Sequence, residues 1–95
     1  MIRKTVHYTG HVQGVGFRYT TTTIAGKHDV AGYVQNLPDG RVRLVAEGEE
    51  KQIDALLQDV QSAMSRYIDH RDIESGEATG EFGEPAKPDT FGVKY

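Results

Sequence analysis

The alternation of apolar and polar residues predicts five strands in this chain. They cover residues 3–11, 30–35, 41–47, 67–73 and 91–95. In the first of them Val6 and Tyr8 fall on one face, which we expect to be buried. The second and third strands form a predicted hairpin, because the segment 36–40 between them carries a Pro-Asp-Gly turn.

The third predicted strand shows the cleanest alternation. Val42, Leu44 and Ala46 fall on one face, whereas Arg43 and Glu47 fall on the other. An antiparallel strand with this pattern buries one face and leaves the other in water. We therefore expect Arg43 and Glu47 to be solvated.

Two stretches show the spacing of an amphipathic helix. In residues 49–65 the apolar side chains recur every three or four positions. They are Ile53, Leu56, Leu57, Val60 and Met64. The pattern in residues 18–28 is weaker, because Thr20–Thr23 and Gly26 are poor helix formers. We expect a helix there mainly because a glycine-rich turn precedes it and a strand follows it.

The order of these elements predicts the fold class. A strand, a helix, two strands, a helix, a strand and a short closing strand make the ferredoxin-like βαββαβ order of α+β proteins. We expect an antiparallel sheet with both helices on one face, in one domain over residues 1–95. Residues 74–90 are rich in glycine, proline and acidic side chains, which predicts a solvated, mobile loop. The fold hosts many functions and decides none of them.

The composition excludes several classes of protein. The chain has no cysteine for disulfides or thiolate metal sites, and its four histidines are scattered without the spacing of metal ligands. A net charge of -3 disfavours binding to nucleic acid or to anionic lipid. No apolar stretch has the length of a membrane span, and none follows the basic start as in a signal peptide. We expect a cytoplasmic protein without metal or cofactor, and the lack of cysteine excludes a disulfide-linked dimer but no other oligomer.

The candidate chemistry begins with the stretch Gly10–Tyr19, in which a glycine-rich turn leads from a strand to an arginine and a helix. Glycines let backbone N–H groups converge, and a helix start offers free N–H groups with a partial positive charge. With Arg18 they would form a small anion site. The stretch lacks the Gly-Lys-Ser/Thr of a P-loop, and Tyr19 replaces the third glycine of a dinucleotide fingerprint. On its own it could also be a simple turn.

Two motifs together resemble the signatures of the acylphosphatase family. The first is GHVQGVGFR at residues 10–18, and the second is GYVQNLPDGRV at residues 32–42, continuing to Gly48. The closing segment at residues 91–95, Phe-x-Val-x-Tyr, is also similar to the ending of that family. The resemblance covers nearly the whole chain.

This resemblance implies hydrolysis of the carboxyl–phosphate bond of acyl phosphates, without a metal ion. The essential arginine of the family falls on Arg18, and its essential asparagine falls on Asn36. The residues of its phosphate-binding loop fall on Gly14, Val15, Gly16 and Phe17, together with Arg18. Inorganic phosphate would then be both the product and an inhibitor.

These residue types suit phosphoryl transfer. The guanidinium of Arg18 can donate two parallel hydrogen bonds to a phosphoryl group, and backbone N–H groups can take its remaining oxygens. The side-chain amide of Asn36 offers a donor and an acceptor, so it can orient a water molecule for in-line attack. The leaving carboxylate is stable as an anion and needs no general acid.

Two other functions stay open from the sequence. One is a ferredoxin-like binding module for RNA or a small regulatory ligand, with Tyr8 and Tyr33 in the predicted strands, although the acidic charge opposes the RNA version. The other is a domain of a larger enzyme, since the signature also resembles the N-terminal domain of the carbamoyltransferase that matures nickel–iron hydrogenases. The chain begins with Met1 and ends where the family ends, which favours a stand-alone protein.

Overall fold

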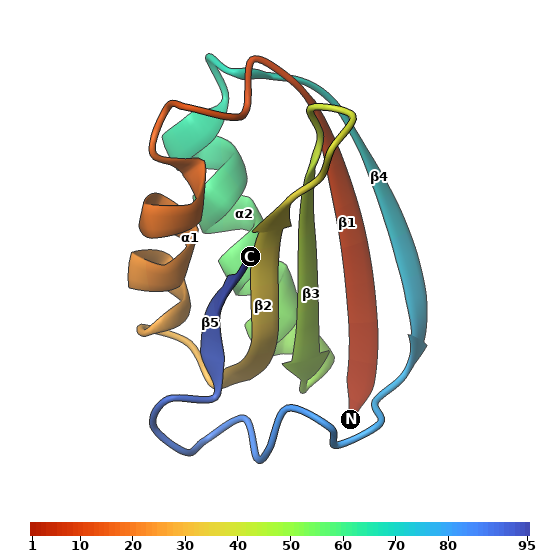
Figure 1. Ribbon diagram of the computed structural model, residues 1–95. Coiled ribbons are helices and arrows are strands. Elements are labelled where there is room, and N and C mark those ends of the chain that lie inside the picture. The colour runs from red at the N-terminus through yellow and green to blue at the C-terminus, as the bar shows by residue number, and fades with distance from the viewer.

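The computed structural model describes residues 1–95 and shows a sheet with two helices packed on one of its faces (Figure 1). In chain order the elements are β1 (Ile2–Gly10), α1 (Phe17–Ala25), β2 (Val30–Asn36), β3 (Val42–Gly48), α2 (Glu50–Met64), β4 (Ile68–Glu77) and β5 (Phe91–Lys94). The predicted βαββαβ order with a short closing strand is confirmed. Neither helix has the length and apolar character that crossing a membrane requires.

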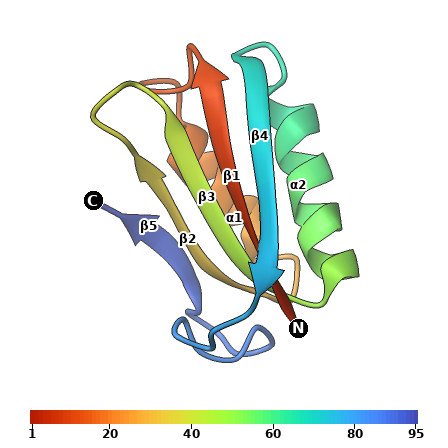
Figure 2. The same ribbon diagram turned by 90° about the vertical axis from the view of Figure 1, so that its right-hand side faces the viewer.

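The strands form one sheet in the order β4-β1-β3-β2-β5 (Figure 2). β1 lies antiparallel to β3 and β4, and β2 lies antiparallel to β3. β5 lies parallel to β2, with Val93 opposite Val34, so the sheet is mixed rather than wholly antiparallel as expected. The path of the chain explains this difference. Residues 78–90 cross the lower end of the sheet, and β5 therefore enters at the end where β2 begins (Figure 1).

The core lies between the sheet and the two helices. Val6 and Tyr8 of β1 are fully buried, as their alternation predicts. The buried residues of α2 are the apolar ones that its spacing singles out: Ile53, Leu56, Leu57, Val60 and Met64. Burial of a large aliphatic side chain contributes about 1.5–3 kcal/mol, so this stripe is what holds α2 on the sheet.

α1 forms in spite of its poor helix formers. The hydroxyls of Thr22 and Thr23 both donate to the carbonyl of Tyr19, at 2.9 and 3.0 Å. On the opposite side of the helix, Phe17 and Thr21 are buried in the core. Tertiary packing of this inner face therefore outweighs the low intrinsic helix propensity of the threonines.

Residues 74–90 are largely exposed, as the composition predicts, but they are not all loop. Glu74–Glu77 continue β4, which is longer than expected, and the rest is hydrogen-bonded to the sheet at Thr79, Gly80 and Thr90. The backbone N–H groups of Thr79 and Gly80 donate to the carboxylate of Glu47, at 2.8 and 3.0 Å. We call residues 78–90 the crossing loop.

The burial of Glu47 corrects the prediction that its face of β3 is solvated. Its side chain is only 2% exposed, and Nε of Arg3 donates to it at 2.8 Å. Phe82 of the crossing loop packs edge-on against Tyr33, with ring centroids 5.6 Å apart. The crossing loop therefore covers this end of the sheet face. The N–H groups of Thr79 and Gly80 in this loop have the carboxylate of Glu47 as their acceptor.

Candidate active site

The glycine loop, residues 11–16, joins the end of β1 to the start of α1 and is anchored by apolar side chains on both sides. Val12 is 1% exposed and Phe17 is 2% exposed. The ring of Phe17 packs on that of Tyr8, with centroids 4.9 Å apart. Burial raises the pKa of Tyr8 to about 12, so its hydroxyl stays protonated beneath the loop. These anchors fix where the backbone of the loop lies.

The backbone N–H groups of the glycine loop are free to bind an anion. Gly14 and Gly16 have φ of 77° and 79°, in the left-handed region that favours glycine. No backbone carbonyl accepts a hydrogen bond from any N–H group between Gly14 and Tyr19. Gly16 is the N-cap of α1 and provides no side chain to cap it. The free N–H groups and the positive end of the helix dipole thus coincide.

Arg18 brings an uncompensated positive charge to the same place. It is the second residue of α1, and its side chain is partly buried. None of the ion pairs in the protein involves Arg18. Its guanidinium carbon lies 5.2 Å from the centroid of the Tyr95 ring. Tyr95 directly follows β5 and also lines the pocket. The guanidinium donors are therefore available to a ligand.

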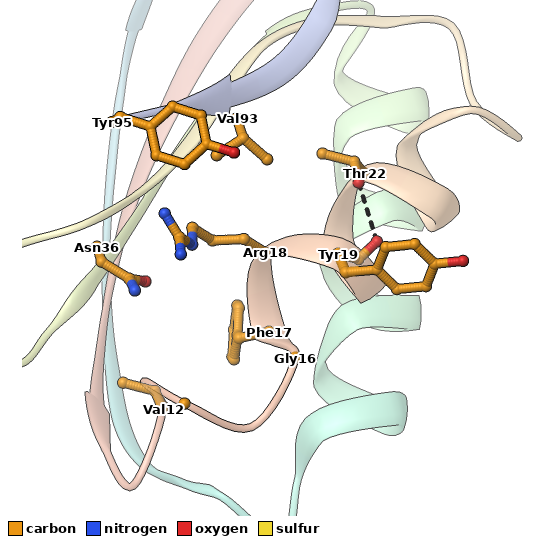
Figure 3. Close-up of a pocket in the computed structure, with 10 residues that line it drawn as sticks. Val12, Gly16, Phe17, Arg18, Tyr19, Thr22, Asn36, Val93 and Tyr95 are labelled. Atoms are coloured by element: carbon orange, nitrogen blue, oxygen red, sulfur yellow. Dashed lines mark hydrogen bonds between the residues drawn. The ribbon is translucent and has the colours of Figure 1, made fainter.

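Asn36 lies across the pocket from Arg18, at the end of β2. Its side chain and the guanidinium of Arg18 extend toward each other in Figure 3. Oδ1 of Asn36 is buried and has no hydrogen-bond partner. An unpartnered buried acceptor costs about 1–3 kcal/mol, and in native proteins such groups are uncommon. Its presence here points to a ligand or a water molecule as the partner.

The turn that follows Asn36 is locked by its own side chains. The carboxylate of Asp39 accepts hydrogen bonds from the backbone N–H and from Nε of Arg41, at 3.1 and 2.8 Å. The backbone hydrogen bond and then the side-chain one hold the pKa of Asp39 below its ordinary value. The turn therefore stays ordered with Asp39 ionised at neutral pH.

The structure brings the predicted site residues together around one pocket of about 310 Å³. It is lined by Val12, Gly14, Gly16, Phe17, Arg18, Tyr19, Thr22, Asn36, Val93 and Tyr95. Val15 is the one predicted residue outside this lining, and its side chain packs against the core instead. Five lining residues were not predicted, namely Val12, Tyr19, Thr22, Val93 and Tyr95. The motif at residues 91–95 pointed to a strand, but not to its position at the pocket, beside β2 and α1.

The structure shows no group of three or more His, Cys, Asp or Glu side chains arranged to hold a metal ion. The polar groups of the pocket are instead backbone N–H groups, the guanidinium of Arg18, the carboxamide of Asn36 and the hydroxyls of Tyr19, Thr22 and Tyr95. Amide and guanidinium groups are hydrogen-bond donors, and they suit a tetrahedral oxyanion such as a phosphoryl group. The carboxamide of Asn36 adds a buried neutral acceptor that has no partner in the protein.

Comparisons with known proteins identify the family of this chain. A family model described as acylphosphatase matches residues 4–87. An acylphosphatase of Oceanobacillus iheyensis is 38% identical over 90 residues, which cover 95% of this chain and 94% of the relative. The crystal structure of acylphosphatase from Bacillus subtilis covers 100% of both chains with a TM-score of 0.83 and 28% identity. The crystal structure of T. kodakarensis HypF matches with a TM-score of 0.79 and 31% identity, over 100% of this chain and 12% of that one. The chain belongs to the acylphosphatase family.

Proposed function

We propose that this protein hydrolyses the carboxyl–phosphate bond of acyl phosphates, releasing a carboxylate and inorganic phosphate. Membership of the acylphosphatase family supports this activity. The observation that carries it is the pairing of free groups across one pocket. Free N–H groups of the glycine loop and the unpaired guanidinium of Arg18 lie on one side, and the unpartnered Oδ1 of Asn36 lies on the other (Figure 3).

The phosphoryl group of the substrate would bind to Arg18 and the glycine loop. The guanidinium donates two parallel hydrogen bonds to two phosphoryl oxygens, which a lysine cannot do. The N–H groups between Gly14 and Phe17 take the remaining oxygen. Because these donors are already oriented, they stabilise the charge of the transition state without reorganisation.

The attacking water would be held by Asn36. Its Oδ1 accepts a hydrogen bond from the water, which directs a lone pair of the water oxygen toward phosphorus. A bond forms between that oxygen and phosphorus while the bond between phosphorus and the acyl oxygen breaks. The electron pair leaves with the carboxylate, and the proton of the water passes to a phosphoryl oxygen. This loose, in-line displacement needs positioning and charge stabilisation more than covalent chemistry.

The direct test is hydrolysis of acetyl phosphate in the presence of EDTA, with p-nitrophenyl phosphate as the monoester control. We expect rapid release of phosphate from the acyl phosphate, with competitive inhibition by inorganic phosphate and no turnover of the monoester. The monoester has a poorer leaving group, because p-nitrophenol is a weaker acid than acetic acid. Decay of acetyl phosphate at the spontaneous rate, or equal turnover of both compounds, would overturn the proposal.

The remaining expectations accompany this proposal as predictions. We expect a monomer that acts on a small substrate, without nucleic acid or membrane as a partner and without a cofactor. Size-exclusion chromatography with light scattering checks the oligomeric state. Fractionation of cells checks the expected cytoplasmic location.

A further inference from the structure

Gln13 links the two halves of the site. Its side-chain Nε2 donates to the carbonyl of Leu37 at 2.8 Å and to the carbonyl of Arg41 at 3.0 Å. Gln13 belongs to the glycine loop, and both acceptors belong to the turn that follows Asn36. A single amide group therefore bridges two segments that are 24 and 28 residues apart in sequence.

The two carbonyls that Gln13 binds are the ones that close the turn. The carbonyl of Arg41 also accepts from the N–H of Leu37 at 2.8 Å, and the carbonyl of Leu37 accepts from the N–H of Gly40 at 3.1 Å. Nε2 thus joins an existing hydrogen-bond network rather than an isolated group. Networks of this kind restrict a segment more than separate bonds do.

We propose that Gln13 is a positioning residue, which fixes Asn36 relative to the phosphate held by the glycine loop. This inference rests on the proposed function. Gln13 is absent from the pocket lining, so it acts through the turn and not on the substrate. Asn36 is the last residue of β2 and directly precedes Leu37, so a shift of the turn moves its carboxamide. The phosphoryl donors lie on the other side of the bridge and keep their own anchors, Val12 and Phe17.

The test substitutes Gln13→Met, which keeps the length of the side chain and removes the donor. A displacement of the order of 1 Å at a reacting group costs up to about a hundredfold in rate. We expect kcat for acetyl phosphate to fall about tenfold or more, while the inhibition constant of inorganic phosphate changes less than about twofold. Gln35→Met is the matched control, because Gln35 is next to Asn36, is partly buried like Gln13, and makes no side-chain hydrogen bond. It should keep the wild-type kcat.

A double-mutant cycle with Asn36→Ala separates positioning from general loosening of the fold. If Gln13 acts through Asn36, adding Gln13→Met to Asn36→Ala should lower kcat by less than about twofold more. Independent, multiplicative effects of the two substitutions would overturn the inference. So would an unchanged kcat in Gln13→Met while the wild type hydrolyses acetyl phosphate. Failure of the wild type itself would instead overturn the proposed function. If Gln13→Met does not fold, Gln13→Asn is measured by the same criteria, because its amide falls one methylene short of the turn.

Discussion

Arg18 stands where a helix disfavours a positive charge. The N-terminal end of α1 carries the positive end of the helix dipole, and Arg18 is the second residue of that helix. No carboxylate in the protein compensates it, whereas Arg3, Lys4 and Arg41 all have acidic partners. A position that costs stability and is not balanced within the protein is expected at a functional site.

Substitution of Arg18 should therefore affect the binding of phosphate before anything else. Arg18→Ala should lower kcat/KM for acetyl phosphate by about a hundredfold or more, as for removal of one oriented donor. Arg18→Lys should recover only part of this loss, because an ammonium group lacks the parallel donors of a guanidinium. Steady-state kinetics and the inhibition constant of phosphate measure both effects. Arg66→Lys is the matched control, since Arg66 is exposed and forms no ion pair. An unchanged inhibition constant in Arg18→Ala would contradict the assigned role.

Substitution of Asn36 should lower the turnover rate, kcat, much more than it weakens the binding of phosphate. Asn36→Ala removes the group that we propose holds the water, so kcat should fall about a hundredfold while the inhibition constant of phosphate changes little. Steady-state kinetics with acetyl phosphate measure kcat, and competition with inorganic phosphate measures the inhibition constant. A variant with wild-type kcat would refute the water-positioning role.

Single residues were predictable where a motif carries chemistry. Arg18 and Asn36 could be proposed as site residues because two motifs at the right separation resemble one family, and the structure places both in the lining of one pocket. The pocket lining by Tyr19 and Val93 could not, since neither residue type is specific to a site. Gln13 was part of the first motif, but its role could not be predicted. Its hydrogen-bond partners are backbone carbonyl groups, which every residue has, so the sequence does not identify them.

At the scale of the element, α1 shows how packing overrides propensity. The hydroxyl of Thr21 differs from those of the adjacent Thr22 and Thr23 in its burial and its hydrogen bonding. Thr21 is fully buried and its hydroxyl oxygen has no partner, whereas Thr22 and Thr23 donate to the carbonyl of Tyr19. The unsatisfied hydroxyl of Thr21 on the buried face of the helix therefore lowers the stability of the protein.

Thr21→Val should stabilise the protein. Valine has nearly the same shape and replaces the unsatisfied hydroxyl by a methyl group, so the free energy of unfolding should rise by about 1 kcal/mol. Thr23→Val is the matched control, because it removes a satisfied hydroxyl from the exposed face of the same helix. It should be neutral or slightly destabilising. Urea denaturation of both variants decides the point, and equal shifts in both would mean that burial of the hydroxyl is not the cause.

Helices and strands could be predicted best where their apolar residues recur at a regular spacing. α2 has five apolar residues on one stripe, and all five are the ones buried. β4 was predicted too short, because its last residues, Glu74–Glu77, are polar and exposed and carry no alternation. They pair with β1 through backbone hydrogen bonds, from Thr5 opposite Glu74 to Ile2 opposite Glu77. The length of this edge strand is therefore determined by its backbone pairing with β1 and not by its own side chains.

In the whole molecule, the pocket and the crossing loop occupy opposite ends of the sheet. The glycine loop lies at the upper end in Figure 1, and residues 78–90 pass beneath the lower end. The parallel position of β5 and the burial of Glu47 both follow from the path of this loop. Neither could be read from local sequence patterns, because the partners of residues 78–90 are more than 30 positions away.

The ionised carboxylate of Glu47 holds the crossing loop. Burial by itself would raise the pKa of Glu47, but hydrogen bonds from the N–H of Thr79, from Arg3 and from the N–H of Gly80 outweigh it and lower that pKa. A carboxyl group whose pKa is lower in the folded than in the unfolded protein stabilises the fold above its ordinary value of 4.5. That contribution is lost as the pH falls through the lower, folded value.

Glu47→Gln should therefore destabilise the protein in a pH-dependent way. The neutral amide accepts weaker hydrogen bonds from Arg3 and the loop, so the free energy of unfolding at pH 7 should fall by about 1–3 kcal/mol. The difference from wild type should shrink steadily below pH 4.5, as the native carboxylate becomes protonated as well. Urea denaturation between pH 7 and acidic pH measures this convergence, and Glu74→Gln, an exposed glutamate of β4, is the control that should stay close to wild type. A difference that is independent of pH would show that Glu47 acts by packing and not by charge. The kcat for acetyl phosphate at pH 7 should be unchanged in Glu47→Gln, because Asn36 of the pocket pairs with Val42, at the opposite end of β3 from Glu47.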